Sequence, residues 1–331
     1  MDCYGTLGPA CQSQEMLEEM FRRGMTGVRL NLSHTSLYQC SAWLENFRDA
    51  ASEAGIKPKL LIDLQGPELR VGNTKPCQLP TGTRVLVGEE GVRIPLGALG
   101  LIKPGQQMLL DDGRLLLEVE EVLKGNVSCR VLRGGLLKPR KSLALPGIAL
   151  DLPTLTEGDR RNLAAAREFG VTGVMLPFVR NDRDLKNLRE ALEEADAGNV
   201  RIFAKIENMD GVDRLSQLLP FADEIVIARG DLGNSMPLWE LPSVQYQIGE
   251  MCTKAHKPYM VVTQMLASME HAAVPTRAEV SDIFYAVLHG ASSVMLTGET
   301  AAGEYPVEAM HYLCRTAEAA RIQLQQRSGM V

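Results

Sequence analysis

The chain has 331 residues, 45% of them hydrophobic and 23% charged, which is enough apolar material for a large buried core. Its formal net charge of −6 argues against a nucleic-acid partner, because phosphate backbones are bound by clustered excess Lys and Arg. Its seven cysteines are scattered without a Cys-x-x-Cys pair, which favours reduced thiols over a disulfide framework or a zinc site.

No targeting or membrane segment is evident in the sequence. The chain begins MDCYGTLGPA, without a basic and apolar leader, and no stretch approaches the roughly 18 apolar residues of a membrane span. We therefore expect a cytoplasmic protein that does not bind a membrane.

Short apolar runs alternate with amphipathic stretches along most of the chain, which is the pattern of successive β-α units and a parallel sheet. Eight such runs predict eight strands, the number found in a (β/α)8 TIM barrel. They are Cys3–Leu7, Gly27–Asn31, Lys59–Asp63, Gly173–Pro177, Ile202–Ile206, Glu224–Ala228, Tyr259–Val262 and Ser293–Leu296.

Helices are predicted between these strands. Ser13 and Thr156 occupy N-cap positions, and Thr156 with Asp159 has the spacing of a reciprocal cap. The predicted helices are Gln14–Arg23, Leu37–Ala54, Glu157–Phe169, Asp182–Glu194, Val212–Leu218, Val244–Ala255, Arg277–Leu288 and Pro306–Gln323.

One interval interrupts the alternation with Gly, Pro and Thr punctuation and short alternating runs, and it predicts a small β-barrel domain. We place this domain at residues 67–146 and the barrel at residues 1–66 and 147–331. The insertion follows the third strand, at the carboxyl end of the barrel, where barrel active sites lie. An insertion there can act as a lid that excludes water from a bound ligand.

Charged side chains follow neighbouring strands at that same end. Lys205 and Glu207 are two residues apart on the fifth strand and point the same way, and Asp231 follows the sixth strand. Two carboxylates suit Mg²⁺ or Mn²⁺, which completes its coordination with water and substrate oxygens, and Lys205 would neutralise a phosphoryl group or an enolate. Taken singly, Lys205 and Glu207 also fit a solvated ion pair, and Asp231 fits an ordinary turn.

Nine short motifs, in this order, resemble the motif series of pyruvate kinases along the whole chain, and such a series is far more specific than any one hexapeptide. They are Arg29–His34, Gln65–Arg70, Leu110–Gly113, Leu145–Gly147, Lys205–Asn208, Ala228–Gly233, Thr263–Leu266, Pro275–Glu279 and Gly298–Ala301. The resemblance implies phosphoryl transfer from phosphoenolpyruvate to ADP, giving pyruvate and ATP, the last step of glycolysis. It also implies a homo-oligomer formed through the barrel domain.

The resemblance also implies roles for individual residues. Lys205 matches the lysine that stabilises the transition state and the enolate, and Thr263 matches a proton relay near the carbon that is protonated. The other matches are Arg29, Lys205, Gly230, Asp231 and Thr263 for substrate binding; Glu207 and Asp231 for Mg²⁺; Asn31, Ser33, Asp63 and the carbonyl of Leu64 for K⁺; and Asn31, Arg70 and Lys141 for the nucleotide.

Some positions depart from the family pattern. Members that need K⁺ commonly carry Thr-Lys before Gly-Pro-Glu, and members that do not need it have Leu-Gln and replace the Glu by Lys. This chain combines Leu64 and Gln65 with Glu68, which leaves no fixed ammonium to substitute for K⁺, so we expect K⁺ dependence. Charges that are usual in the family are missing at Ser235, His289, Ser292 and Ala302.

The chain ends where family members usually continue into a regulatory domain, so we expect no activation by a sugar phosphate through such a domain. Two alternatives remain open. One is a metal-dependent pyruvate or oxaloacetate lyase, which also holds an enolate on Mg²⁺ between a Glu and an Asp. The other is a degenerate kinase relative that binds a ligand and regulates another process.

Overall fold

The computed structural model describes residues 1–33, 35–111, 113–148 and 152–328. Two motif residues, His34 and Asp112, lie outside these described residues. The chain forms two compact units. The first contains Met1–Gly66, Thr154–Leu232 and Trp239–Val331, and the second contains Pro67–Pro153 and Gly233–Leu238.

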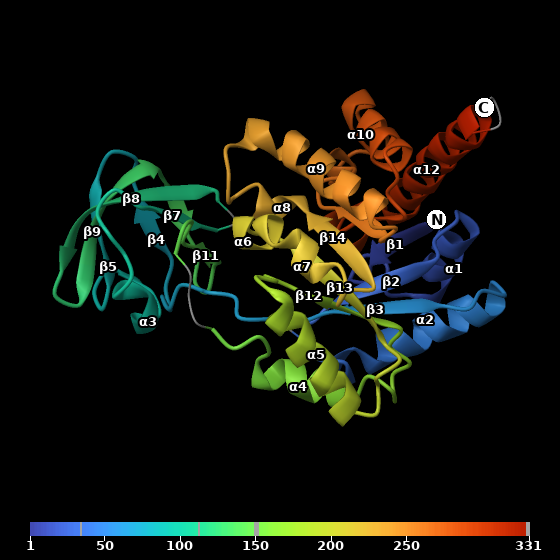
Figure 1. Ribbon diagram of the computed structural model, residues 1–331, viewed down its shortest axis with the longest axis horizontal. Helices are drawn as coiled ribbons and strands as arrows, with labels where there is room; N and C mark the ends of the chain where they lie inside the picture. Colours follow the sequence, from blue (N-terminus) through green and yellow to red (C-terminus); the bar gives the residue numbers. More distant parts are fainter. Residues whose placement is uncertain (34, 112, 149–151, 329–331) are drawn as a thin grey trace. The chain divides into compact units, whose positions relative to one another are not determined.

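The first unit is an eight-stranded parallel barrel surrounded by helices, which confirms the predicted fold class (Figure 1). The order around the barrel is β1-β16-β15-β14-β13-β12-β3-β2. All eight predicted strands are present, with ends shifted by at most one residue. Their bounds are β1 Asp2–Thr6, β2 Gly27–Asn31, β3 Lys59–Asp63, β12 Gly173–Leu176, β13 Arg201–Ile206, β14 Glu224–Ala228, β15 Tyr259–Val262 and β16 Ser293–Met295.

Side chains that point inward fill the barrel and hold the strands in register. Parallel strands covered by helices are buried on both faces, which explains why β14 is buried along its whole length. In this core, most strands contribute one or two inward side chains, which pack against one another as in other barrel interiors. These are Tyr4, Leu61, Met175, Phe203, Val226, Ala228, Met260, Val262 and Met295.

The helices follow the predicted pattern with local differences. The predicted helix Val212–Leu218 is two short helices, because Arg214 leaves helical geometry at φ −103° and ψ 13°. The α-helices of this unit are α1 Gln14–Arg22, α2 Ser41–Glu53, α4 Glu157–Ala164, α5 Asp182–Glu194, α6 Met209–Asp213, α7 Leu215–Leu218, α8 Arg229–Leu232, α9 Leu241–Lys254, α10 Arg277–Leu288, α11 Gly298–Ala301 and α12 Pro306–Ser328. Single 3₁₀ turns occupy Tyr38–Cys40, Leu238–Glu240 and Ala267–Glu270.

The predicted caps are present and one of them also anchors a loop. Ser13 accepts from the Met16 N–H, and Thr156 and Asp159 form a reciprocal capping box. Asp159 additionally accepts the N–H groups of Gln65 and Gly66 at 2.9 and 3.1 Å. The start of α4 therefore holds the chain that leaves β3.

The second unit is inserted after β3 and contains a strongly curled six-stranded half-barrel, ordered β11-β7-β8-β9-β5-β6. Among the described residues β11 and β6 have a strand partner on one side only, so the sheet is less closed than the predicted small barrel. A pair formed by β10 and β4 completes the unit. Its elements are β4 Cys77–Leu79, β5 Arg84–Gly88, β6 Val92–Arg93, α3 Leu96–Leu99, β7 Gln107–Leu110, β8 Leu115–Leu123, β9 Asn126–Arg133, β10 Gly135–Leu137 and β11 Leu143–Ala144.

This insertion has its own apolar core, which includes Val87, Met108, Leu117 and Val131. In the part of the chain that the structure describes, no helix is both long and apolar enough to cross a bilayer.

Candidate active site

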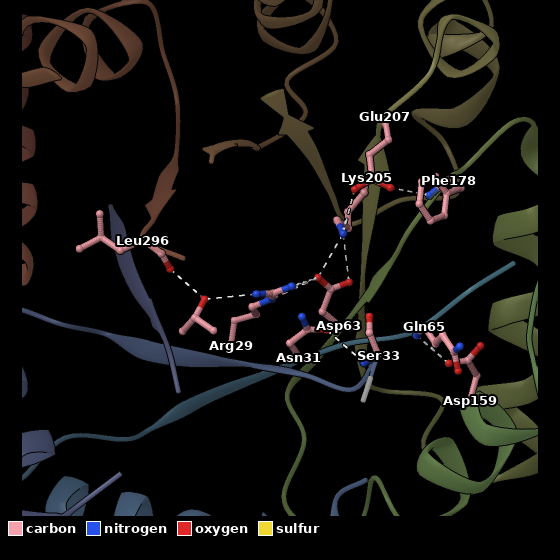
Figure 2. A network of polar contacts seen from close by, with 11 residues as sticks. Arg29, Asn31, Ser33, Asp63, Gln65, Asp159, Phe178, Lys205, Glu207 and Leu296 are labelled. Carbon is pink, nitrogen blue, oxygen red and sulfur yellow. Dashed lines mark hydrogen bonds and ion pairs between the residues drawn. The ribbon is translucent and has the colours of Figure 1, made fainter. Parts of the chain in front are cut away.

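The carboxylate of Asp63, at the end of β3, forms ion pairs with two cationic side chains from other strands (Figure 2). Arg29 from β2 donates to Oδ2 of Asp63 through Nε at 3.1 Å and Nη2 at 2.5 Å. Nζ of Lys205, from β13, lies 3.1 Å from the same oxygen and 3.3 Å from Oδ1. Asp63 is only 2% exposed, so these contacts take place almost without water.

Burial and ion pairing shift the pKa values of Asp63 and Lys205 in opposite directions. Burial raises the pKa of Asp63, but attraction to Lys205 and Arg29 outweighs it and holds the pKa below its ordinary value. Burial likewise lowers the pKa of Lys205, and the carboxylates of Asp63 and Glu207 together raise it above its ordinary value. Lys205 is therefore an ammonium at neutral pH, able to stabilise negative charge but unsuited to act as a base.

Glu207 is the second buried carboxylate, placed directly after the last residue of β13 and 3% exposed. Its Oε1 lies 2.9 Å from Nζ of Lys205. Its Oε2 accepts the N–H of Phe178 at 2.7 Å, and Phe178 has the left-handed φ of 53°. The backbone after β12 thus turns sharply to donate to this carboxylate.

Arg29 is also tied to β1, the strand that pairs with β2 on the side away from β3. Its Nη1 lies 3.4 Å from Oγ1 of Thr6 on β1, and that hydroxyl donates to the carbonyl of Leu296 at 2.9 Å (Figure 2). The guanidinium is therefore fixed from both sides, and its side chain is 13% exposed. A fixed planar fork of this kind suits carboxylate or phosphate oxygens.

Gly230 and Asp231 lie in α8, the one-turn helix that begins directly after β14. The strand β14 pairs with β13, with Lys205 opposite Val226, so the carboxylates of Glu207 and Asp231 follow adjacent strands. Thr263 comes directly after β15, the other neighbour of β14. A Cβ atom added to Gly230 would lie 2.9 Å from Cγ2 of Thr263, so Thr263 leaves no room for a side chain at residue 230.

The donor set fits a divalent ion that takes only part of its ligands from the protein. Within the described ranges, no cluster of three or more His, Cys, Asp or Glu side chains has the geometry to hold a metal. Two carboxylates, Glu207 and Asp231, at adjacent strand ends match the habit of Mg²⁺, which keeps several waters and binds through one or two carboxylates and substrate oxygens. This arrangement therefore suits an open metal site and not a closed one formed only by protein ligands.

The residues predicted to bind a monovalent cation lie at the ends of the paired strands β2 and β3, where Asn31 is opposite Asp63. Oδ1 of Asn31 accepts the N–H of Ser33 at 3.1 Å, and the N–H of Leu64 donates to Met175. Asn31 and Asp63 thus end paired strands, and the Asp63 carboxylate is already shared with Arg29 and Lys205.

Of the residues predicted to contact a nucleotide, Asn31 belongs to the barrel unit, and Arg70 and Lys141 belong to the inserted unit. Arg70 forms an ion pair with Glu68 at 2.7 Å and donates to the carbonyl of Arg140 at 2.8 Å. Nζ of Lys141 lies 2.7 Å from Oδ1 of Asp111. Both cations are already held by partners within their own unit.

Two members of the network were not expected from the sequence. Thr6 is two residues from the inward-facing Tyr4, so strand alternation alone would have found it. Phe178 contributes its backbone N–H, for which its apolar side chain carries no signal.

Comparison with known proteins gives a consistent family. Residues 2–310 match the family model described as pyruvate kinase, barrel domain. The pyruvate kinase of Bacillus licheniformis is 38% identical over 330 residues, covering 95% of this chain and 56% of the relative. That of Aeropyrum pernix is 38% identical over 318 residues, covering 95% of this chain and 69% of the relative. This chain thus spans little more than half to about two thirds of these relatives.

Proposed function

Because this chain belongs to the pyruvate kinase family, we propose that it transfers the phosphoryl group of phosphoenolpyruvate to ADP, giving pyruvate and ATP. The observation that carries the proposal is the ammonium of Lys205, held within 3.1 Å of the buried carboxylates of Asp63 and Glu207 at the strand ends. A fixed cation at this position is what transfer of a phosphoryl group requires, because catalysis there is mainly positioning and charge stabilisation.

In the proposed reaction, a β-phosphate oxygen of ADP attacks the phosphorus while the bond from phosphorus to the enol oxygen breaks. Arg29 and Lys205 neutralise the phosphoryl oxygens during this transfer, and Lys205 then stabilises the enolate oxygen that is left. Their positions are maintained by Asp63, which contacts both side chains. Bringing both cations to one point in advance avoids reorganisation during the reaction.

We propose that Glu207 and Asp231 hold Mg²⁺ or Mn²⁺, which would supply charge neutralisation and orientation of the substrate oxygens. Asn31, Ser33, Asp63 and the carbonyl of Leu64 are the proposed K⁺ ligands. Asn31, Arg70 and Lys141 are the proposed nucleotide contacts. A cytoplasmic location and a homo-oligomer formed through the barrel also stay predictions.

Thr263 and Gly230 complete the substrate site in this proposal. Protonation of the enolate at C3 forms the methyl group of pyruvate, and the hydroxyl of Thr263 relays that proton. An unassisted hydroxyl is a poor acid near neutral pH, so the proton originates from water or another group behind it. Thr263 lies close to Gly230, within 2.9 Å of the position that a Cβ atom there would take, which supports a place for its hydroxyl beside the same substrate.

The test is pyruvate formation from phosphoenolpyruvate and ADP with saturating Mg²⁺ and K⁺, measured for the wild type, Lys205→Met and Asp231→Ala. We expect activity in the wild type and its loss in both variants. Lys59→Met is the matched control, because Lys59 also pairs with an aspartate, Asp2 at 2.6 Å, at the opposite end of a barrel strand.

The same preparation separates the alternatives. Oxaloacetate cleavage with Mg²⁺ but without nucleotide identifies a lyase, and a thermal midpoint that ADP and Mg²⁺ leave unchanged supports it. Binding of phosphoenolpyruvate without any turnover identifies a regulator. Either result contradicts the proposed kinase activity.

A further inference from the structure

The guanidinium of Arg229, at the junction of β14 and α8, holds the backbone that follows β15. Nε and Nη2 both donate to the carbonyl of Thr263, at 3.1 and 2.7 Å. Nη2 also lies 3.2 Å from the carbonyl of Gln264 and 3.0 Å from Sδ of Met265. Arg229 therefore contacts three consecutive residues of one loop with a single side chain that is 12% exposed.

Asp282 on α10 fixes the other side of this guanidinium. Its Oδ2 lies 2.5 Å from Nη1 of Arg229. The planar fork is thereby oriented between a carboxylate and the loop carbonyls, an arrangement that a lysine cannot reproduce. Asp282 therefore acts on the loop through Arg229.

The loop that Arg229 holds is in an unusual conformation. Thr263 has φ 77° and Gln264 has φ 55°, both in the left-handed region. This region is disfavoured for residues with a Cβ atom and is a genuine outlier for a β-branched residue. Such a conformation persists only where the surroundings over-determine it. The four contacts of Arg229 with this loop help to hold Thr263 and Gln264 in this conformation.

The conformation of Thr263 also decides where its side chain lies. Its Cγ2 and Oγ1 lie 2.9 and 3.8 Å from the position that a Cβ atom on Gly230 would take. Rotation of φ to the usual negative range would swing the Cα–Cβ bond and carry both atoms away from Gly230. Backbone and hydroxyl position are therefore coupled.

We propose that Arg229, oriented by Asp282, is a positioning residue that keeps Thr263 in its left-handed conformation and so aims the Thr263 hydroxyl at the substrate. The role of that hydroxyl rests on the proposed function, whereas the effect on the backbone does not. Arg229 and Asp282 themselves contact no reacting atom in this proposal.

The kinetic test compares Arg229→Lys and Asp282→Asn with the wild type and with Arg201→Lys. Arg201 is the matched control, since it also pairs with a buried carboxylate, Glu224 at 3.1 Å, at the amino end of β13. We expect kcat to fall roughly 10- to 100-fold in the two test variants, as a misplaced catalytic group costs, with a much smaller change in KM. The solvent deuterium isotope effect on kcat should rise, because proton delivery becomes slower.

A double-mutant comparison separates positioning from general damage. In a Thr263→Ala background the hydroxyl is absent, so adding Arg229→Lys should cost no further activity. Additive losses in the double variant, or full activity of Arg229→Lys, would overturn the proposal.

Crystal structures of the same variants decide the matter even if the wild type forms no pyruvate. We expect φ of residue 263 to become negative in Arg229→Lys and to stay positive in Arg201→Lys. A positive φ at Thr263 in both Arg229→Lys and Asp282→Asn contradicts the proposal. Absence of wild-type turnover together with a changed φ would instead reject the proposed function and leave the positioning role standing.

Discussion

Lys205 and Asp63 form an ion pair of 3.1 Å although their strands, β13 and β3, do not pair with each other. Both strands flank β12, so the two side chains meet across the barrel interior above Met175. A barrel allows this because inward-facing residues of nonadjacent strands share one layer. The network at the strand ends is thus a property of the closed barrel.

Replacing Lys205 should reduce stability as well as activity. Lys205→Met removes the ammonium that pairs with both Asp63 and Glu207, and removing one partner of a buried ion pair costs about 3–5 kcal/mol. Urea unfolding should show this loss, and the initial rate should fall by roughly 100-fold or more. Lys59→Met should change each quantity far less, because the side chain of Lys59 is 42% exposed. Equal effects of the two substitutions would contradict this account.

The stability contributed by Asp63 should depend on acid pH. Its pKa is lowered in the folded state, so its contribution is complete above the ordinary value of 3.8 and is lost as pH falls below that value. The difference in unfolding free energy between the wild type and Asp63→Asn should therefore be constant from pH 7 to about 5 and shrink at more acidic pH. Urea titrations over this range measure it.

Glu224 provides a control, because the stability that it contributes should change with pH in the opposite direction. Burial raises its pKa despite hydrogen bonds from Ser293 and Ser292 and the charge of Arg201, so the folded protein binds the proton more tightly than the unfolded chain. Its contribution to stability should therefore grow as pH falls from neutral towards 4.5. The same pH dependence of the difference in unfolding free energy for Asp63→Asn and for Glu224→Gln would contradict this account of the two environments.

Removing one proposed metal carboxylate should weaken the response to Mg²⁺. Asp231→Ala should need much more Mg²⁺ for half-maximal activity and should lose the increase in thermal midpoint that Mg²⁺ with phosphoenolpyruvate gives the wild type. Asp49→Ala, on an exposed position of α2, is the control and should match the wild type in both measurements. Unchanged Mg²⁺ dependence in Asp231→Ala would remove this residue from the metal site.

The oxygen donors at the ends of β2 and β3 should make activity depend on K⁺. Replacing K⁺ by tetramethylammonium should lower the rate, since that cation is too bulky for such donors. Ser33→Ala should raise the K⁺ concentration needed for half-maximal activity. Ser36→Ala, in the same loop, removes a hydroxyl that pairs with Gln39 and should not change that concentration. A rate that is the same with both cations would contradict K⁺ dependence.

A methyl group at Gly230 should disturb the site sterically. Its Cβ atom would lie 2.9 Å from Cγ2 of Thr263, so one of the two residues must shift. We expect Gly230→Ala to lower kcat/KM by roughly tenfold or more. Gly158→Ala on α4 is the control, because its Cβ atom would make only an ordinary contact of 3.6 Å with Thr156. Wild-type kinetics in Gly230→Ala would show that the Thr263 contact is not needed.

The local patterns of the sequence predicted the elements well, because they depend on short-range physics. Alternating and continuous apolar runs identified all eight strands, and the Thr156–Asp159 cap was recognised from its spacing alone. Breaks inside helices were less predictable. The interruption at Arg214 lies within an otherwise helical pattern, and no Gly or Pro at that residue marks it.

These sequence patterns could not predict which individual side chains contact one another. The motif series singled out Lys205, Glu207 and Asp63, but it assigned Asp63 to a cation site and did not pair it with Arg29 and Lys205. The contacts of Phe178 and Arg229 were also missed, since one is made by a backbone N–H and the other with a carbonyl at a neighbouring strand end.

Periodicity and motif spacing were enough to predict the strands, the inserted unit and the residue types at strand ends, because neighbours along the chain carry these patterns. Closure of the barrel decided the rest. It brought Asp63 to Arg29 and Lys205, and Arg229 to the left-handed Thr263, across 34 to 142 residues of sequence. Ion pairs and hydrogen bonds act over a few ångströms, so distances along the chain carry no record of them until the fold has closed.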